Sequence, residues 1–304
     1  MSGTMNTIAL CTAIYPGVEA YLKDWYRSVL GQTDHAYRLW IGLDAISQED
    51  AKLAMGGDLD AEWIEADPGD TPAQVRQRVL ERVVETCDGV VLVDSDDVLH
   101  PSRVASARAA LRTSDLSGSA LRVVDQQCRD LGLTFGLPAG LKPEDVFPGN
   151  NVYGLSNSAY RSELLRECLP VPPEEELVDW FLATRAWLMG AGMSFDPVAR
   201  MYYRQHETNT ARVKPPFGTK QVAQDTERVM RHFQVMQAFP LASARGDRAV
   251  TLERTARDIE TFHRLIVLQP ARLEKYVQAL NALEIAPIWW SCVANHSLKH
   301  MWTT

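Results

Sequence analysis

Cysteine, long apolar runs and basic residues are all scarce in this sequence. The five cysteines are widely spaced and form no CxxC pair: Cys11, Cys87, Cys128, Cys168 and Cys292. This spacing favours reduced thiols over a disulfide framework or a zinc site. No stretch approaches the ~20 apolar residues of a bilayer span, and the first residues lack the basic start and apolar core of a signal peptide. We therefore expect a cytoplasmic protein.

The charge balance and two missing motifs narrow the function. Asp and Glu outnumber Lys and Arg by 39 to 31, and the net charge of −8 argues against a nucleic-acid partner. The first strand is not followed by GxGxxG, and no GxxxxGK(S/T) loop occurs. A bound nucleotide would need another way of holding its phosphates. The 304 residues, 46% of them hydrophobic, suit one large globular domain or two ordinary ones.

Apolar runs and helical periodicity alternate over the first part of the chain. This pattern predicts a mostly parallel sheet with right-handed crossovers. Strands are predicted over 7–14, 37–43, 62–65, 90–93, 119–125, 152–160, 194–196 and 199–203. Helices are predicted over 19–30, 71–86, 102–112, 177–190, 221–238, 248–269 and 271–283. We predict an α/β domain over 1–212 and a helical region over 213–304, which begins with a flexible connector or lid over 213–220.

The stretch VVLVDSDDVLHP, residues 90–101, is the most informative part of the sequence. Its apolar run is typical of a strand buried on both faces, and Asp94, Asp96 and Asp97 follow at once. Carboxylates this close repel one another unless a cation or strong donors hold them. Oxygen ligands suit Mg²⁺ or Mn²⁺, and ligands bind at the carboxyl ends of such strands. The alternative is an acidic turn that caps the helix begun by Pro101.

Other polar side chains follow predicted strands or begin helices. Asp44 ends the second strand, where a carboxylate often binds a ribose, although a turn residue is the alternative. Arg76 is a candidate for a phosphate or base, or else a solvated arginine. Asn151 is suited to a hydroxylated substrate, or to a turn. Asp179 lies among apolar residues, which suits a general base, or else stabilises the helix dipole. His206 is a candidate metal ligand.

Several of these segments together resemble a known family. They are TIALCTAIYPG…SVLGQT, Asp44, VLVDSDDVLHP, LVDWFLATRAWLMGAG and YYRQHETNT. In this order they are similar to the inverting nucleotide-sugar glycosyltransferases of family 2, which have the GT-A fold. The resemblance covers Thr7 to about Arg212 and implies a Rossmann-like, mostly parallel sheet, here with a helical C-terminal extension. It also implies a metal-dependent enzyme that moves a sugar from a nucleotide-diphosphate donor to a hydroxyl acceptor.

The resemblance further implies roles for individual residues. Asp179 matches the catalytic base, and Asp96 and His206 match the metal site, for Mn²⁺ or Mg²⁺. Residues expected to bind the nucleotide sugar are Ala13, Tyr15, Asp44, Arg76, Asp94, Ser95 and Arg204. Residues expected on the acceptor or sugar side are Asp97, Asn151 and Trp180. Two departures are Val178, where the family usually has Glu, and Gln77, where it often has Asn.

The expected donor, acceptor and biological setting come from the resemblance to the family alone. The expected donor is a UDP-, GDP- or dTDP-sugar, and the expected acceptor is a saccharide or a lipid-linked saccharide. Bacterial polysaccharide or lipopolysaccharide synthesis is the usual setting. The tail carries Trp289, Trp290 and Trp302, which would contact the inner face of a membrane, pack on the α/β domain or form a homodimer through the C-terminal helices.

Two other functions remain open from the sequence. The motif DSDDV after an apolar strand also resembles the opening motif of haloacid-dehalogenase-type phosphatases. That motif normally begins its fold, whereas two strand–helix units precede it here. The second alternative is a non-catalytic protein that binds nucleotide sugars, which Val178 suggests because it alters the surroundings of the expected base.

Overall fold

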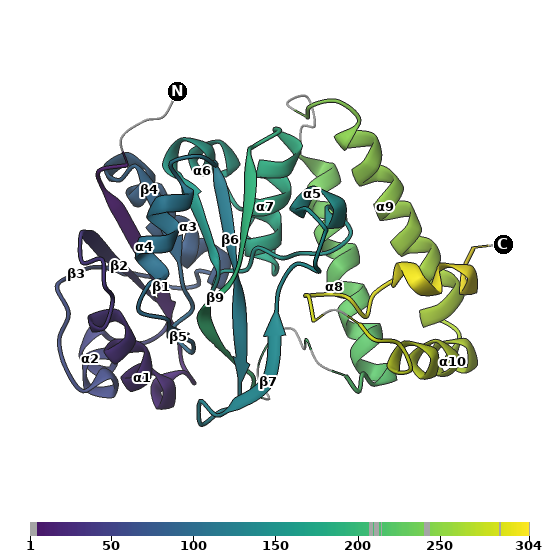
Figure 1. Ribbon diagram of the computed structural model, residues 1–304, viewed down its shortest axis with the longest axis horizontal. Helices are drawn as coiled ribbons and strands as arrows, with labels where there is room; N and C mark the ends of the chain where they lie inside the picture. Colours follow the sequence, from purple (N-terminus) through teal and green to yellow (C-terminus); the bar gives the residue numbers. More distant parts are fainter. Residues whose placement is uncertain are drawn as a thin grey trace.

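One twisted sheet forms the centre of the molecule (Figure 1). The computed structural model describes residues 5–206, 209, 213, 215–239, 244–285 and 287–303. Within these residues nine strands join in the order β3-β2-β1-β4-β8-β6-β9-β5, with β7 paired to β6. The strands are β1 Ile8–Ile14, β2 Tyr37–Leu43, β3 Ala61–Glu65, β4 Gly89–Leu92, β5 Val98–Leu99, β6 Leu116–Val124, β7 Asp130–Phe135, β8 Ser158–Arg161 and β9 Met193–Arg204.

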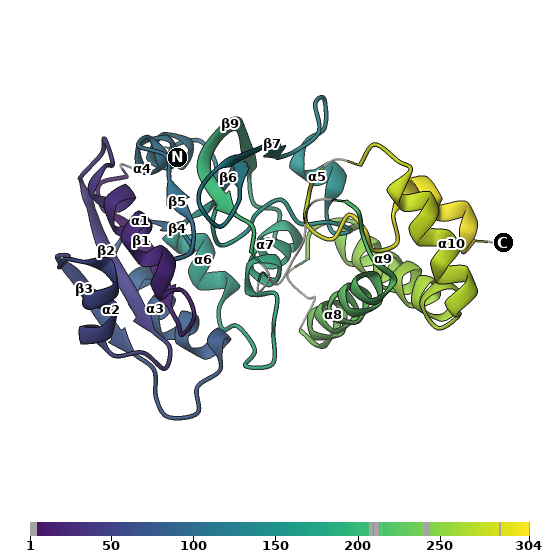
Figure 2. The same cartoon turned by 90° about the horizontal axis from the view of Figure 1, so that it is seen from below.

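Helices cover both faces of this sheet and form a separate block at its far end. The helices are α1 Glu19–Leu30, α2 Gln48–Met55, α3 Pro72–Thr86, α4 Arg103–Ala110, α5 Pro143–Val146, α6 Ser162–Cys168, α7 Val178–Leu188, α8 Thr219–Ala238, α9 Arg248–Phe262 and α10 Pro270–Asn281. A π-helical turn, His263–Val267, follows α9, and a 3₁₀ helix, His296–Met301, lies near the C-terminus. Helices α3, α6 and α7 lie on one side of the sheet and α4 on the other (Figure 2).

Strands β3, β2, β1 and β4 are mutually parallel. Their carboxyl ends therefore meet at one edge of the sheet, where α/β proteins bind ligands. Strand β4 is also antiparallel to β8, which continues the sheet into β6 and β9. Because β9 is parallel to β6 and pairs with the short β5 that follows the acidic turn, the end of β9 comes close to the end of β4.

Helix α3 shows how local sequence places an element against the sheet. Thr71 caps the helix by accepting a hydrogen bond from the backbone of Gln74, whose side chain binds the Thr71 backbone in return. Pro72 occupies the first turn, where its missing N–H costs nothing. The helix packs so closely on β2 that a Cβ atom at Gly42 would lie 2.9 Å from the Val79 Cγ2 atom. Glycine at this position therefore sets the helix–sheet distance.

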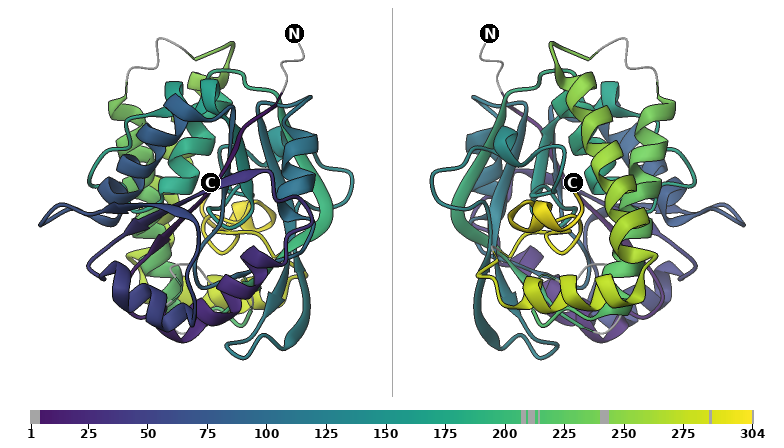
Figure 3. Two further views of the ribbon diagram at one scale, coloured as in Figure 1. Left: turned by 90° about the vertical axis from the view of Figure 1, so that its left-hand side faces the viewer. Right: turned by 90° about the vertical axis from the view of Figure 1, so that its right-hand side faces the viewer.

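The C-terminal helices form a block beside the sheet. Helices α8 and α9 run side by side and α10 crosses them (Figure 3). The chain then returns to the sheet, where Trp289 forms a β-bridge with Asn151. Trp289, Trp290 and Trp302 are only 5%, 5% and 3% exposed, so these rings pack inside the protein and offer no aromatic surface to a membrane. Among the described residues, no helix combines the length and apolarity of a bilayer crossing.

The predicted elements match the structure best where an apolar pattern is strong. The helix over 19–30 and the strand over 37–43 have the predicted bounds. Strand β7 and helices α2 and α6 were not predicted, because β7 is mostly exposed and the two helices are short. The predicted boundary at Arg212 lies outside the described residues. In the predicted connector, Phe217 is buried and its backbone exchanges two hydrogen bonds with the Asn281 side chain.

Candidate active site

A cleft of about 710 Å³ opens at the carboxyl ends of the parallel strands. It brings together side chains that are far apart in the sequence. The predicted site residues that line it are Tyr15, Asp44, Arg76, Asp94, Asp96, Asp179 and His206. The ends of β1, β2 and β4, the first turns of α3 and α7 and the end of β9 supply these residues, so the sheet topology gathers them.

The acidic turn after β4 is the most charged part of the cleft. Each of Asp94, Asp96 and Asp97 offers one oxygen to a group in which all these atoms lie within 4.8 Å of one another. Burial, and then the charge of Asp96, raises the pKa of Asp94 to about 6. The same two causes, with the charge of Asp94, raise the pKa of Asp97 well above its usual value. The turn therefore carries repulsion that a bound cation would relieve.

Five hydrogen bonds hold this turn in place. The Ser95 hydroxyl donates to the Ala13 carbonyl at 2.8 Å, which ties the turn to the end of β1. The Arg204 Nε atom donates to the Asp96 carbonyl at 2.8 Å, and the Arg204 backbone N–H donates to Asp97 Oδ1 at 2.7 Å. The Ser156 hydroxyl contacts both Asp94 and Asp97. The backbone is thereby fixed while the Asp96 carboxylate faces the cleft.

Two aromatic residues and His206 surround the Asp96 carboxylate. The His206 Nε2 atom lies 2.9 Å from Asp96 Oδ2, and the Tyr15 hydroxyl donates to the same oxygen at 3.4 Å. The ring of Tyr21 stacks on His206 with a centroid distance of 5.1 Å, and the Arg204 guanidinium lies over the Tyr21 ring, 4.6 Å from its centroid. Tyr21, on α1, therefore orients His206 toward Asp96, a contact that the sequence analysis missed.

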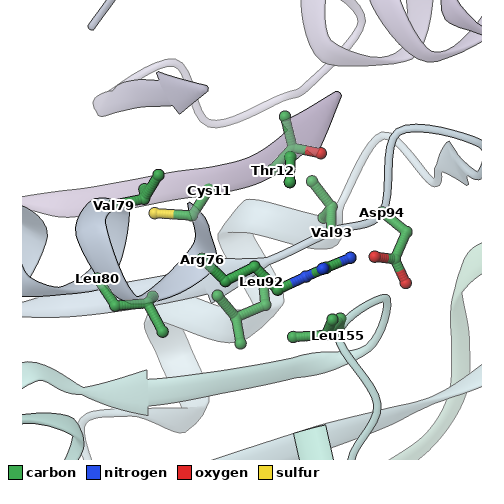
Figure 4. Close-up of a pocket in the computed structure, with 10 residues that line it drawn as sticks. Cys11, Thr12, Arg76, Val79, Leu80, Leu92, Val93, Asp94 and Leu155 are labelled. Atoms are coloured by element: carbon green, nitrogen blue, oxygen red, sulfur yellow. The ribbon is translucent and has the colours of Figure 1, made fainter. Parts of the chain in front are cut away.

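Arg76 brings a positive charge to the donor side of the cleft. It comes from α3, and its side chain extends toward the Asp94 carboxylate, with Leu155 also in the lining (Figure 4). Its Nη1 atom also donates to the Pro72 carbonyl at 3.2 Å, which steadies the side chain along the first turns of the helix. A small recess of about 30 Å³ adjoins the cleft here and includes Ala13 in its lining.

Asp179 lies in the first turn of α7 and lines the same cleft as the acidic turn. Burial raises its pKa to about 7, with smaller raising contributions from the charges of Asp94 and Glu175; the Trp180 backbone N–H and Arg76 act in the lowering direction. The Asn151 Nδ2 atom donates to Asp179 Oδ2 at 2.9 Å and fixes that oxygen. A carboxylate with this pKa is suited to accept a proton near neutral pH.

Six predicted site residues do not line the cleft: Ala13, Ser95, Asp97, Asn151, Trp180 and Arg204. Trp180 has no exposed surface, and its ring stacks on His232 at 4.7 Å, so it belongs to the core instead of the acceptor side. Asp97 and Asn151 are likewise buried and support the acidic turn and Asp179. The Arg204 guanidinium is bound by the Gln126 carbonyl and by Asp24, which places it behind the turn, away from a donor.

The sequence analysis also missed a set of residues that do line the cleft. Trp289 and Trp290 come from the tail, and Arg228 comes from α8. Trp290 has a positive φ of 66°, which is a rare conformation for a bulky residue and persists only where surrounding packing imposes it. Its ring is parallel to that of Trp180, with a centroid distance of 6.2 Å. The unusual pairing of two tryptophans in a short tail was the available signal.

The donor atoms of the acidic turn fit a divalent cation. Carboxylate oxygens are the ligands of Mg²⁺ and Mn²⁺, and neutral imidazole suits Mn²⁺ better than Mg²⁺. The described acidic residues that line the cleft are Asp44, Asp94, Asp96, Glu174, Glu175, Glu176 and Asp179. Arginines are fewer in this lining, since only Arg76 and Arg228 contribute there among the described residues. A phosphate group would meet a repulsive field in this cleft unless a cation came with it.

Comparison with known proteins identifies the architecture. No protein-family model and no curated protein matches the sequence. The crystal structure of S. aureus TarS 1-349 in complex with UDP-GlcNAc aligns with a TM-score of 0.55 at 13% identity, over 84% of this chain and 72% of that chain. The mannosyltransferase PcManGT from Pyrobaculum calidifontis, in complex with GDP-Man and Mn²⁺, aligns with a TM-score of 0.54 at 12% identity, over 97% and 83%.

The chain has the GT-A fold. The predicted fold class is thereby confirmed, and the phosphatase alternative loses its structural basis. Against a structure of S. aureus TarS that is longer than the 1-349 segment, the match spans only 43% of that chain, again with 84% of this one. The likeness therefore concerns the domain that contains the cleft, and it does not by itself assign a substrate.

Proposed function

We propose that this chain is a metal-dependent inverting glycosyltransferase, which moves a sugar from a nucleotide-diphosphate donor to a hydroxyl acceptor. One observation carries the proposal. A single cleft of a GT-A fold holds an acidic turn that fits a divalent cation and, in the same lining, a partly buried carboxylate, Asp179, with a pKa of about 7. The first feature suits a diphosphate leaving group and the second suits the activation of an alcohol.

The donor is expected along the strand ends. Asp44 and Tyr15 would contact the nucleoside, and Arg76 and Asp94, which line the same cleft, would contact the ribose or the phosphates. Asp96 and His206 would hold the cation, Mn²⁺ or Mg²⁺. When bound there, the cation would neutralise charge on the departing nucleoside diphosphate. The two aligned structures contain UDP-GlcNAc in one case and GDP-Man with Mn²⁺ in the other, which supports a UDP- or GDP-linked donor for this chain.

Asp179 is the proposed general base. Its carboxylate removes the proton of the acceptor hydroxyl while that oxygen attacks the anomeric carbon, and the bond to the diphosphate breaks. One displacement of this kind inverts the anomeric configuration. Trp289, Trp290 and Arg228 border the same part of the cleft and would contact a saccharide or lipid-linked acceptor. We place the reaction in bacterial polysaccharide or lipopolysaccharide synthesis, at the cytoplasmic side of the membrane.

The decisive experiment separates donor binding from transfer. Thermal shift with UDP-, GDP- and dTDP-sugars, with and without Mn²⁺, first identifies the donor. Asp179→Asn should then reduce transfer or donor hydrolysis by about 10²–10⁴-fold, while calorimetric donor affinity is kept. Glu163→Gln removes an acidic residue from the first turn of α6, outside the cleft, and is the control for a helix-dipole effect.

Three outcomes would count against the proposal. Equal turnover by Asp179→Asn and the parent would remove Asp179 as the base. Full activity in EDTA would show that the reaction needs no divalent cation. Tight nucleotide binding with no transfer to any acceptor and no hydrolysis would favour the non-catalytic binding protein instead. If the enzyme is active, the anomeric configuration of the product, read by NMR, tests inversion directly.

A further inference from the structure

A second cavity lies on the side of the sheet that carries α4, apart from the cleft. It has a volume of about 280 Å³ and shares no lining residue with the cleft. Residues of α4 and the following Thr113 form one wall, and the first halves of β6 and β9 contribute the rest. We call this cavity the α4 groove; the polar residues that line it are Arg103, Ser106, Thr113, Ser117, Ser119, Ser194 and Asp196.

Arg103 is the unusual member of this lining. It is 2% exposed, and its Nη2 atom donates to the Leu92 and Ser158 carbonyls at 3.2 and 2.8 Å. Its Nε atom is buried and has no hydrogen-bond partner, and no carboxylate of the described residues forms an ion pair with it. Burial lowers the pKa of Arg103 to about 9, so the guanidinium still carries its charge at pH 7. A buried cation is normally paired.

Hydroxyl groups surround the same space from several directions. Ser106 comes from α4, Ser117 and Ser119 from β6, and Ser194 from β9. The Ser119 hydroxyl is buried, and it too has no partner within the described structure. The Ser106 hydroxyl already donates to the Arg103 carbonyl, and the Ser194 hydroxyl is bonded to that of Ser114. Arg103 from α4 and the Ser117 and Ser119 hydroxyls from β6 therefore line the groove from two walls, which suits a tetrahedral anion better than a planar carboxylate.

The single carboxylate of the lining does not cancel this charge. Asp196 Oδ2 is bound by the Arg200 Nε atom at 2.7 Å, and Asp196 Oδ1 accepts the Val198 backbone N–H at 2.9 Å. Arg200 therefore compensates Asp196, although the field of Asp196 still reaches Arg103 and acts to raise its pKa. The groove is left with the charge of Arg103 and with the hydroxyls of Ser117 and Ser119, of which that of Ser119 is buried without a partner.

We propose that the α4 groove binds a phosphate-type oxyanion, either free phosphate or the phosphate group of a small metabolite. Such a ligand would pair the Arg103 guanidinium and give the Ser119 hydroxyl a partner. Its position also connects it to the acidic turn. Arg103 supports the Leu92 carbonyl, two residues before Asp94, and the Ser158 carbonyl, two residues after Ser156. Occupancy of the groove and binding at the cleft should therefore influence one another, and reciprocally.

Calorimetric titration with inorganic phosphate tests this proposal. The buffer contains EDTA, because phosphate could otherwise enter the cleft with a metal ion. The parent should bind phosphate, and Arg103→Gln should lose that binding. Ser119→Ala removes only an unpartnered hydroxyl, so its folding should be intact while phosphate affinity falls roughly 10-fold, as expected for a lost hydrogen bond to a charged group. Arg76→Gln, which changes the cation of the cleft, should bind phosphate like the parent.

Each result has a definite meaning. No heat of binding in the parent would overturn the proposal and indicate a groove filled by water. Loss of binding in Arg76→Gln, with binding kept in Ser119→Ala, would place the phosphate in the cleft and overturn it as well. Titration with glycerol 3-phosphate and with acetate separates the ligand types. Equal affinity for acetate and phosphate would contradict the tetrahedral anion, whereas preference for either phosphate compound supports it and identifies the source.

Discussion

The two sides of the cleft are built in different ways. The donor side, which comprises Tyr15, Asp44, Arg76, Asp94 and Asp96, comes from strand ends and one helix within the first third of the chain. The far wall, which comprises Asp179, Arg228, Trp289 and Trp290, comes from α7, α8 and the tail. A parallel sheet brings strand ends together whatever follows, but the far wall exists only because distant segments pack against the sheet.

This difference predicts that the two sides respond differently to substitution. Changes on the donor side should act on metal and nucleotide binding with little effect on the fold. Changes on the far wall should affect stability and acceptor use together, since the same rings form the core and border the cleft. Four experiments, from the largest expected effect to the smallest, test this comparison, and a measurement of stability against pH follows them.

Asp96→Asn should have the largest effect. It removes the charge that faces the cleft and that His206 and Tyr15 contact. Mn²⁺ binding, measured by calorimetry, should fall below detection, and metal-dependent donor binding should disappear with it. The melting temperature should stay the same or rise, because repulsion with Asp94 and Asp97 is relieved. Unchanged Mn²⁺ affinity would show that the acidic turn is not the metal site.

Trp289→Ala should weaken both the fold and acceptor use. The Trp289 ring lies 4.0 Å from Phe135 and contacts Tyr203 edge-on, so truncation should cost about 3–5 kcal/mol of unfolding free energy. Trp302→Ala is the matched control, because that ring is equally buried against Phe262 and Tyr276 but does not line the cleft.

The two tryptophan variants should separate in kinetics at a temperature where both are folded. Trp289→Ala should raise the acceptor KM and leave donor affinity unchanged, whereas Trp302→Ala should alter neither. If both variants raise the acceptor KM equally, the effect is one of general destabilisation, and the far wall has no specific part in acceptor binding.

Ser156→Ala should have an intermediate effect on the donor side. Its hydroxyl contacts Asp94 and Asp97 without lining the cleft itself. Loss of an outer contact of this kind typically costs about 10–100-fold in metal affinity. Ser297→Ala, in the 3₁₀ helix near the C-terminus, is a control that should leave Mn²⁺ affinity at the parent value. An unchanged affinity in Ser156→Ala would mean that the turn holds its geometry without this hydroxyl.

The pH dependence should show the smallest change. The base works only when ionised, so the rate of the parent should fall as pH drops below about 7, the pKa of Asp179. Asn151→Ala removes a hydrogen-bond donor to the ionised carboxylate, so the pKa of Asp179 should rise further. The fall in rate on the acid side of the pH–rate profile should therefore begin at a higher pH. The Asn150 side chain contacts the Trp289 carbonyl instead, so Asn150→Ala should leave the pH–rate profile unchanged.

The same pKa gives a stability test with a defined sign. Asp179 has a folded-state pKa of about 7, above the usual ~3.9 of an unfolded aspartate. Its ionisation therefore costs folding free energy progressively as pH rises from about 4 to 7, at about 1.4 kcal/mol for each unit of difference. The melting temperature of Asp179→Asn should accordingly be higher than that of the parent at pH 8 and equal to it at pH 4. A lower melting temperature at pH 8 would mean that the carboxylate is stabilised by contacts not seen here.

Much of the donor side could be predicted because its signals are local. The apolar strand before Asp94, the cap at Thr71 and the carboxylate after β2 each depend on a few consecutive residues. Trp180 and Arg204 were placed wrongly on the binding surface, because a motif gives a position along an element and says little about burial. The helical spacing of α7 is apolar on every side, so only packing decided that Asp179 faces the cleft while Trp180 faces the core.

The sequence by itself determined the strands, the acidic turn and the likeness to a fold, since short-range periodicity and turn chemistry encode them. Only the tertiary structure decided which side chains share a cavity. Arg228, Trp289 and Trp290 reach the cleft because the C-terminal segments bury apolar area against the sheet. Arg103 has no ion-pair partner among the described residues because α4 packs it against the sheet, away from any free carboxylate. Contacts between segments 100 or more residues apart, such as that of Asp96 with His206, depend on the packing of the whole chain.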